Sequence, residues 1–188
     1  MINSANDIIV DQIWAFIAYW WDFKVYHYGD NQVIKYSRIS LILGSAHRQK
    51  LTHDYETCKK YLQDYIVDVV VMNNYQYTET QDYIDGEQLL LHDLDDPEIR
   101  DQFSDIVDKV KNMEDDGYAP IDLIGVGGLR KIYFSNIIVD SHKKLRIIDA
   151  TLLECISLGW RAWICRPLLR CAVKIQHNHI SNISNYKQ

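Results

Sequence analysis

Apolar and polar positions alternate along the first part of the chain in the manner of β-strands. Residues 21–28 (WDFKVYHY) and 32–39 (QVIKYSRI) are rich in aromatic and β-branched side chains, and the polar residues 29–31 separate them. This pattern predicts a β-hairpin. Residues 67–72 and 75–84 show the same composition and predict two further strands.

Between the hairpin and these strands, apolar residues recur every three or four positions, which predicts an amphipathic helix. Its apolar face comprises Leu51, Tyr55, Cys58, Leu62, Tyr65 and Ile66. A second helix is predicted to begin at Asp96, which can cap it, with Pro97 in the first turn and Glu98 complementing the helix dipole. It ends near Gly117, and its buried face is predicted to hold Ile99, Phe103, Ile106, Val107 and Val110.

The rest of the chain is less regular. Residues 137–139 and 145–148 are two short apolar runs around a polar turn, which predicts another hairpin, and residues 160–175 predict one or two short helices. Strands dominate the first half of the chain and helices the second. The sequence therefore predicts an α+β fold with two lobes, residues 1–84 and residues 85–188.

Composition supports a globular chain. Of 188 residues 47% are hydrophobic, with five Trp and thirteen Tyr, which is enough to build a core. The net charge of −6 offers no overall positive field, so we expect no nucleic-acid partner. Charge is uneven: residues 79–116 hold fourteen acidic and three basic residues, a net −11, and residues 130–188 hold ten basic and three acidic, a net +7. Two solvated faces explain this pattern, and a basic surface for acidic partners is the alternative.

The four cysteines, Cys58, Cys155, Cys165 and Cys171, do not have the spacing of a zinc site. We therefore expect free thiols and a cytoplasmic protein. The longest apolar stretch, residues 13–21, is too short to span a bilayer, so we expect no membrane association. A homo-oligomer with an interface formed by the tryptophan-rich N-terminal strand and the C-terminal helices is compatible with the sequence, as is a monomer.

Five features, in this order along the chain, carry candidate chemistry. They are Lys35 in the strand QVIKY, Glu56 on the first helix, the stretch TQDYIDGEQL at residues 80–89, Asn136, and Asp149 thirteen residues later. Together they resemble the protein-kinase-like fold, which includes aminoglycoside phosphotransferases and related small kinases. The resemblance covers roughly residues 21–151.

The resemblance implies a role for each residue. Lys35 would contact the nucleotide phosphates and Glu56 would orient it. Residues 80–89 would form a hinge-like stretch between the lobes, where backbone groups of Asp82, Tyr83 and Ile84 would meet adenine, with Thr80 at the back of the pocket. Asn136 and Asp149 would ligate Mg²⁺ through hard oxygen atoms.

The chain departs from the family pattern in two places. No glycine precedes Gly29, so the Gly-rich phosphate loop is absent, and the D-F-G motif reads Asp149-Ala150-Thr151. The position of the catalytic Asp has two solutions. An ungapped match of residues 129–136 to the catalytic loop places Lys131 there and predicts a pseudokinase. A gapped match, with an inserted Gly-rich loop, places Asp122 there.

The leading hypothesis is an ATP- and Mg²⁺-dependent phosphotransferase acting on a small-molecule or protein hydroxyl, with Asp122, Lys35 and Glu56 as catalytic residues. The alternative is a pseudokinase or nucleotide-binding interaction module without phosphotransfer. A third interpretation is an α+β domain in which the family-like residues are coincidental. Only 39 residues follow Asp149 (188 − 149), so the helical lobe is expected to be reduced.

Overall fold

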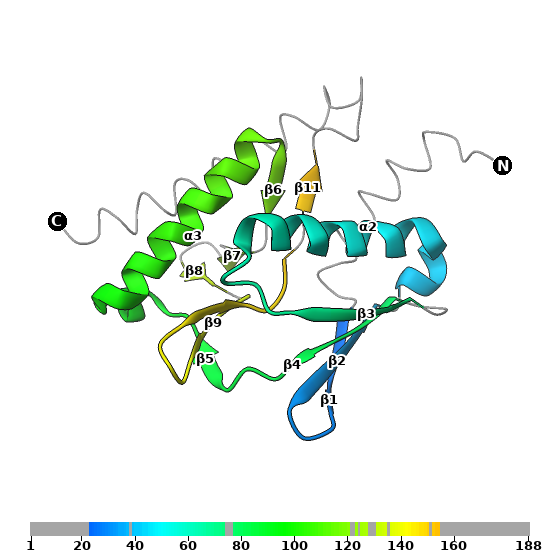
Figure 1. The fold of residues 1–188 in the computed structure, drawn as a ribbon, viewed down its shortest axis with the longest axis horizontal. Helices are drawn as coiled ribbons and strands as arrows, with labels where there is room; N and C mark the ends of the chain where they lie inside the picture. Colours follow the sequence, from blue (N-terminus) through cyan, green and yellow to red (C-terminus); the bar gives the residue numbers. More distant parts are fainter. Residues whose placement is uncertain are drawn as a thin grey trace. The chain divides into compact units, whose positions relative to one another are not determined.

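The chain is an α+β protein, as the sequence predicts. The computed structural model describes residues 23–37, 39–73, 77–120, 123, 125–127, 131–134, 136–150 and 152–154. The chain divides into two compact units, one made of residues 1–53 and 68–83 and the other of residues 54–67 and 84–188 (Figure 1). Each unit is described by itself below.

The first unit contains a four-stranded antiparallel sheet in the order β1-β2-β4-β3. Its strands are β1 (Phe23–Tyr28), β2 (Gln32–Ser37), β3 (Val69–Asn73) and β4 (Tyr77–Asp82). β1 and β2 form the predicted hairpin through a turn at Gly29, which has φ 65°, a left-handed value that glycine adopts without a steric cost. β2 and β4 are the two middle strands, so their backbones are paired on both sides.

Helix α2 (Ile39–Leu62) joins the two units. The apolar spacing predicted its second half, but the helix begins at Ile39, twelve residues before Leu51. Gly44 interrupts it with φ 72° and ψ −152°, so two helical pieces meet at a kink. The first piece escaped prediction because Ile39 to Leu43 continue an apolar run that also suits a strand.

The second unit packs helix α3 (Pro97–Asp115) beside a three-stranded antiparallel sheet in the order β10-β9-β5. These strands are β5 (Gly86–Gln88), β9 (Ile137–Asp140) and β10 (Leu145–Ile147), and the 3₁₀ helix η1 (Leu91–Asp95) precedes α3. Two further two-stranded sheets pair β6 (Tyr118–Pro120) with β11 (Leu152–Glu154), and β7 (Gly125–Gly127) with β8 (Lys131–Tyr133).

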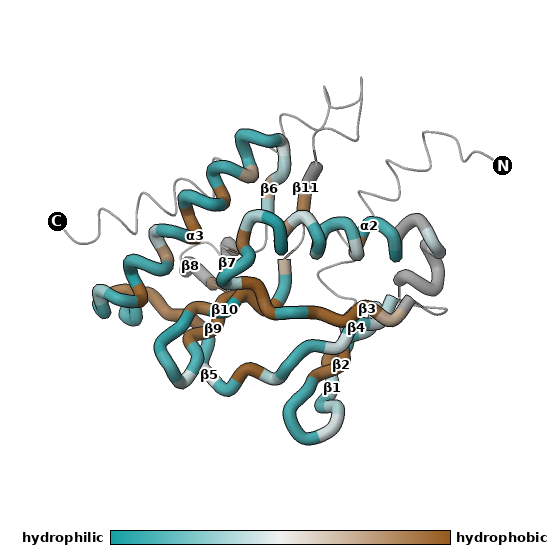
Figure 2. The backbone as a smooth tube through the Cα atoms, in the orientation of Figure 1, coloured by the Kyte–Doolittle hydropathy of each residue, from teal (hydrophilic) through white to brown (hydrophobic). Residues whose placement is uncertain are grey.

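An apolar core holds the second unit together. All five predicted core residues of α3 are buried, and Met113 extends the row. Hydrophobic segments follow one side of α3 and the β9–β10 hairpin, as Figure 2 shows. Phe103 of α3 meets Phe134 edge to face with ring centroids 5.3 Å apart, a favoured aromatic geometry. Leu94, Ile137, Leu145 and Ile147 complete the centre of this core.

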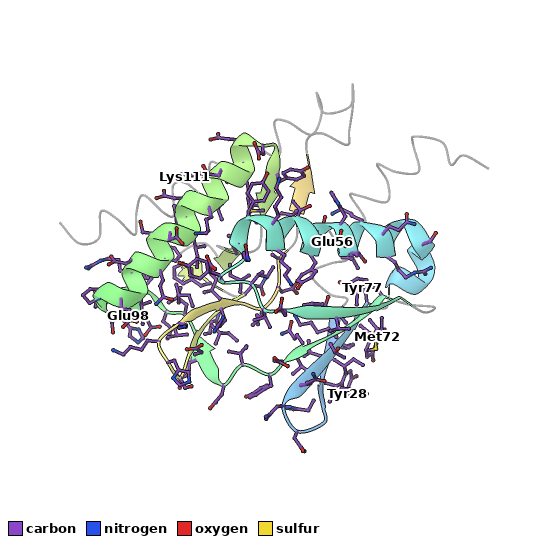
Figure 3. The ribbon with its side chains drawn as sticks, viewed as in Figure 1. Tyr28, Glu56, Met72, Tyr77, Glu98 and Lys111 are labelled. Atoms are coloured by element: carbon purple, nitrogen blue, oxygen red, sulfur yellow. The ribbon has the colours of Figure 1, made fainter. Side chains whose placement is uncertain are left out.

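The caps of α3 also follow the prediction. The side chain of Asp96 accepts a hydrogen bond from the Glu98 amide at 3.0 Å, and Pro97 occupies the first turn. The helix ends at Asp115, just before Gly117, which has φ 90°. Glu98 therefore lies at the N-terminal end of the helix, as labelled in Figure 3, where its charge complements the helix dipole.

Candidate functional site

Among the described residues of the first unit, the interior face of the sheet is unusually polar. Side chains alternate between the two faces of a strand, so Lys35 and Ser37 of β2 share one face with Glu79 and Gln81 of β4. All four are buried. We call these four residues the buried polar face. Lys and Glu are almost never fully buried unless they are paired, so this face requires an explanation.

Lys35 and Glu79 form an ion pair at the centre of this face. They are direct partners in the β2–β4 register, and Lys35 Nζ lies 3.5 Å from Glu79 Oε1, with the residues 4% and 7% exposed. The Tyr77 hydroxyl donates a 2.6 Å hydrogen bond to the other carboxylate oxygen, Oε2. Glu79 thus holds both a cation and a hydroxyl donor, and the charge of Lys35 is compensated within the sheet.

Gln81 adds a polar atom that the sheet does not satisfy. Its side-chain oxygen Oε1 is buried and has no hydrogen-bond partner within the described part of the chain. A buried acceptor without a donor costs about 1–3 kcal/mol. Gln81 lies between Val33 and Val69 in the sheet register, and neither side chain can donate. A donor group of a bound molecule would remove this cost.

The hinge-like stretch begins in the same strand. Thr80 is buried on the other face of β4, between Ile34 and Val70 in the register. Tyr83 is exposed, and its backbone N–H donates to the Asn31 carbonyl at 2.8 Å, while its ring lies 5.3 Å from that of His27. The predicted adenine contact at Tyr83 therefore has a backbone donor that is already used within the unit.

The remaining hinge-like residues lie at the end of β4 and beyond it. Asp82 is exposed and pairs with Gln32 in the register, and Ile84 is partly buried. Ile84 begins the second stretch of the other unit. Their predicted contacts with adenine stay predictions.

Two carboxylates of α2 point in different directions. Glu56, the residue predicted to orient Lys35, is exposed on the helix surface and is labelled in Figure 3. Asp54, two residues earlier, is only 2% exposed. Since successive residues turn about 100° around a helix, these two side chains cannot share a face. Of the two residues, Asp54 is therefore the better candidate for a carboxylate that contacts a buried group.

The β9–β10 hairpin of the second unit places the two predicted metal ligands near each other in the backbone pattern. Ile137 pairs with Ile147, and the Ile148 amide donates to the Asn136 carbonyl at 3.0 Å. Asn136 and Asp149 consequently stand at the open end of one hairpin, and both are partly buried. Their oxygen atoms are of the kind that Mg²⁺ prefers, so the chemistry of these two side chains fits the ion that the resemblance implies.

The other end of the hairpin is fixed by Asp140. Its Oδ1 atom accepts hydrogen bonds from the His142 amide at 2.8 Å and the Lys144 amide at 2.9 Å, and its Oδ2 atom lies 3.2 Å from Arg146 Nε. Burial alone would raise the pKa of Asp140, but the two amides and Arg146 outweigh it and hold the pKa below its usual value.

The structure describes one of the two candidates for the catalytic Asp position. Asp122 lies outside the described residues. Lys131 begins strand β8 and pairs with Gly127 of β7, so the Gly-rich insertion expected before Asn136 contains a β-hairpin. No group of three or more His, Cys, Asp or Glu side chains within the described ranges is arranged to hold a metal ion.

Three residues of interest escaped the sequence analysis: Glu79, Gln81 and Asp54. The first two follow the same alternation as Tyr77 along β4, which could have placed them on one face. Their partners could not be identified, because the register between β2 and β4 is set across forty residues. Asp54 is one turn before Cys58, a predicted core residue, so their spacing could have placed Asp54 on the buried face of the helix.

Comparison with models of known protein families finds no match to this chain, and comparison with curated proteins finds no relative. Within the described helices, none combines the length and the apolar character that crossing a membrane demands.

Proposed function

We propose that the chain is a minimal kinase-like protein that binds ATP with Mg²⁺ and transfers a phosphoryl group to a hydroxyl of a small molecule or a protein. The observation that carries the proposal is the buried ion pair of Lys35 and Glu79 on the two middle strands. A buried ion pair seldom adds net stability, since desolvation of both charges offsets their attraction. Such a pair at the centre of a sheet is better explained by a role for its lysine in binding an anion.

The order of elements supports a two-lobed, kinase-like arrangement. A strand hairpin with Lys35, a helix, two strands, a second helix and a hairpin flanked by Asn136 and Asp149 follow one another along the chain. This is the order implied by the resemblance for the part of the chain that the structure describes. The N-lobe of the proposal corresponds to residues 1–84 and the reduced C-lobe to residues 85–188.

In this proposal each unit supplies its own groups. Lys35 contacts the phosphates from a middle strand of the sheet, and Glu79 orients its ammonium group. Asn136 and Asp149 hold Mg²⁺, which when bound with ATP neutralises phosphate charge and leaves the terminal phosphoryl group open to transfer. Asp122 accepts the hydrogen bond of the acceptor hydroxyl and orients its oxygen.

Two acidic residues of α2 are candidates for the helix carboxylate of the proposal. Glu56 is the residue implied by the resemblance, and Asp54 is the buried acid of the same helix. Catalysis in this class is mostly positioning and charge neutralisation, so either carboxylate would act on the lysine rather than on the acceptor.

A second candidate is a nucleotide-binding interaction module without phosphotransfer. It is favoured by the Tyr77–Glu79–Lys35 contacts, which already satisfy the lysine within the sheet. It is favoured also by the ungapped match, in which Lys131 takes the place of the catalytic Asp. A protonated lysine cannot accept the proton of a substrate hydroxyl.

The two candidates separate in one experiment with γ-labelled ATP and Mg²⁺. The phosphotransferase proposal predicts release or transfer of label by the wild-type protein and its loss in Asp149→Ala. The control is Asp108→Ala, which removes an exposed carboxylate of α3 that pairs with Lys111. Absence of turnover together with a rise in melting temperature on addition of ATP and Mg²⁺ supports the interaction module. Absence of both effects contradicts both candidates.

A further inference from the structure

One face of α3 makes polar contacts with the free edge of the three-stranded sheet. β10 is an edge strand in the described structure, and a strand edge presents backbone groups that need partners. The side-chain amide of Gln102 supplies two of them. Its Nε2 atom donates to the Lys143 carbonyl at 2.9 Å, and its Oε1 atom accepts from the Leu145 amide at 3.0 Å. The amide thus replaces the peptide group of a missing strand.

A second contact lies one helical turn further along α3. Asp105 accepts a 2.7 Å hydrogen bond from the Tyr65 hydroxyl. The backbone of the Tyr65 segment in turn covers the other end of β10, because the Ile147 amide donates to the Tyr65 carbonyl at 2.8 Å and the Val67 amide donates to the Ile147 carbonyl at 3.0 Å. Burial and the Asp105 hydrogen bond raise the pKa of Tyr65, so its hydroxyl stays protonated and donates.

A third contact comes from the start of the helix. Asp96, which caps α3, also pairs with Lys143 of the hairpin turn, with 2.8 Å between Lys143 Nζ and Asp96 Oδ2. We call Asp96, Gln102 and Asp105 the α3 polar seam. The seam contacts the hairpin turn, the first residue of β10 and the segment that pairs with its last residue.

We propose that the α3 polar seam sets the position of the hairpin ends, and that Gln102 is a positioning residue for Asn136 and Asp149. This inference rests on the proposed function, in which those two residues hold Mg²⁺. Leu145 and Asp149 are four residues apart, a separation of at most about 13 Å in an extended chain, and β10 ends at Ile147 between them. Since β9 pairs with β10 up to Ile147, a shift at Leu145 is carried along the ladder to the Asn136–Ile148 contact.

Loss of the Gln102 contacts is expected to weaken metal binding. Partners that orient a metal ligand typically change metal affinity by about 10- to 100-fold when they are removed. Gln102 acts through the backbone rather than by direct contact with a ligand, so we expect the lower end, on the order of tenfold.

The test compares Gln102→Met with Ile106→Val. Gln102→Met keeps the length of the side chain and removes both hydrogen bonds to the hairpin, together with the 3.3 Å bond that Gln102 Nε2 donates to the Glu98 carbonyl within the helix. Ile106 is a fully buried core residue on the same helix, and its truncation lowers stability while it leaves the hydrogen bonds of Gln102 in place. Amide exchange is measured at Leu145 and Ile148, and Mn²⁺ affinity is measured by electron paramagnetic resonance in the presence of ATP. We expect Gln102→Met to speed exchange at both amides and to weaken Mn²⁺ binding about tenfold, with neither effect in Ile106→Val.

Gln102→Glu supplies a rescue. An ionised carboxylate still accepts from Leu145 but repels the Lys143 carbonyl, whereas a protonated carboxyl again offers one donor and one acceptor. The Leu145 amide resonance of this variant should therefore move toward its wild-type position as pH falls through the titration of the new carboxyl group. A resonance that stays displaced at low pH contradicts the role given to the Gln102 donor.

Three results would overturn the inference: unchanged Leu145 exchange in Gln102→Met, faster exchange with unchanged Mn²⁺ affinity, or an equal loss of affinity in Ile106→Val. Failure of the proposed function looks different, because the wild-type protein itself then binds no Mn²⁺ with ATP. In that case the side-chain amide resonances of Asn136 test whether Gln102 positions this residue. Their displacement in Gln102→Met alone supports the positioning role, and their constancy contradicts it.

Discussion

At the scale of single residues, the most informative feature is the buried ion pair of Lys35 and Glu79, of which only the lysine was identified from the sequence. Lys35 was selected because QVIKY resembles the lysine-bearing strand of the protein-kinase-like fold. Glu79 was not, because it stands in the polar run YTETQD and its relation to Lys35 depends on the pairing of two strands separated by a helix. Strand register between distant segments is set by the packed fold and cannot be read locally.

The pair makes a clear stability prediction. Lys35→Met alone leaves the Glu79 carboxylate buried without its cation, and removal of one partner of a buried pair costs about 3–5 kcal/mol. The double variant Lys35→Met/Glu79→Leu removes both charges and should be close to wild type, since apolar replacement of such pairs is often neutral or stabilising. Chemical denaturation measures both values. Equal destabilisation by the single and double variants would contradict the coupling.

Gly86 gives a second prediction at this scale. A Cβ atom at this position would lie 2.3 Å from the Val139 carbonyl oxygen and 2.9 Å from the Asp140 Cα atom, both of them backbone atoms of β9. Gly86→Ala should therefore break the β5–β9 pairing and lower the melting temperature. Gly29→Ala serves as a comparison, because it has open space around its Cβ position and only a strained φ of 65°. A smaller loss in Gly86→Ala than in Gly29→Ala would contradict the close approach.

At the scale of elements, the sequence predicted best where local chemistry decides. The N-cap, the proline and the apolar row of α3 each depend on neighbouring residues, and all are confirmed. The β1–β2 and β9–β10 hairpins are confirmed for the same reason. The short strands β5, β6 and β11 were not predicted, because they pair with partners that are distant in the sequence. β7 and β8 pair with each other and were not predicted, because their Gly-rich segment has little periodicity. The predicted helices over residues 160–175 lie outside the described residues.

The β9–β10 hairpin predicts a dependence on pH. The folded protein lowers the pKa of Asp140, while the unfolded chain has a value near 3.9. The stability supplied by this carboxylate is therefore fully present above that unfolded value and is lost as pH falls through the folded pKa. Asp140→Asn, which keeps the size of the side chain, should be less stable than wild type at neutral pH.

The measurement for this prediction is the free energy of unfolding of both proteins between pH 6 and pH 3. The difference between wild type and Asp140→Asn should shrink as the pH falls, because the wild-type carboxylate becomes protonated. Exposed Asp108 offers a control, since its replacement by Asn removes a surface ion pair of little energetic value. A difference that does not change with pH would contradict the contribution assigned to the Asp140 charge.

At the scale of the whole molecule, the protein consists of two units whose buried side chains differ in polarity. Among the described residues, the second unit has an extensive apolar core, whereas the buried side chains of the first are largely polar. Composition predicted that a core would form but not where it would lie, because burial depends on which distant segments meet. The sequence supplied an ordered set of candidate site residues, which stays a prediction, and it could not supply the contacts of each residue, because these depend on distant segments.

The central claim is that Lys35 binds the phosphates of a nucleotide. The most direct measurement is a calorimetric titration of ATP with Mg²⁺ into wild type, into Lys35→Met/Glu79→Leu and into Lys24→Met, which removes an exposed lysine of the neighbouring strand. The proposal predicts binding to wild type and Lys24→Met and its loss in a folded double variant. Equal affinity in all three proteins, or no binding to wild type, would contradict it.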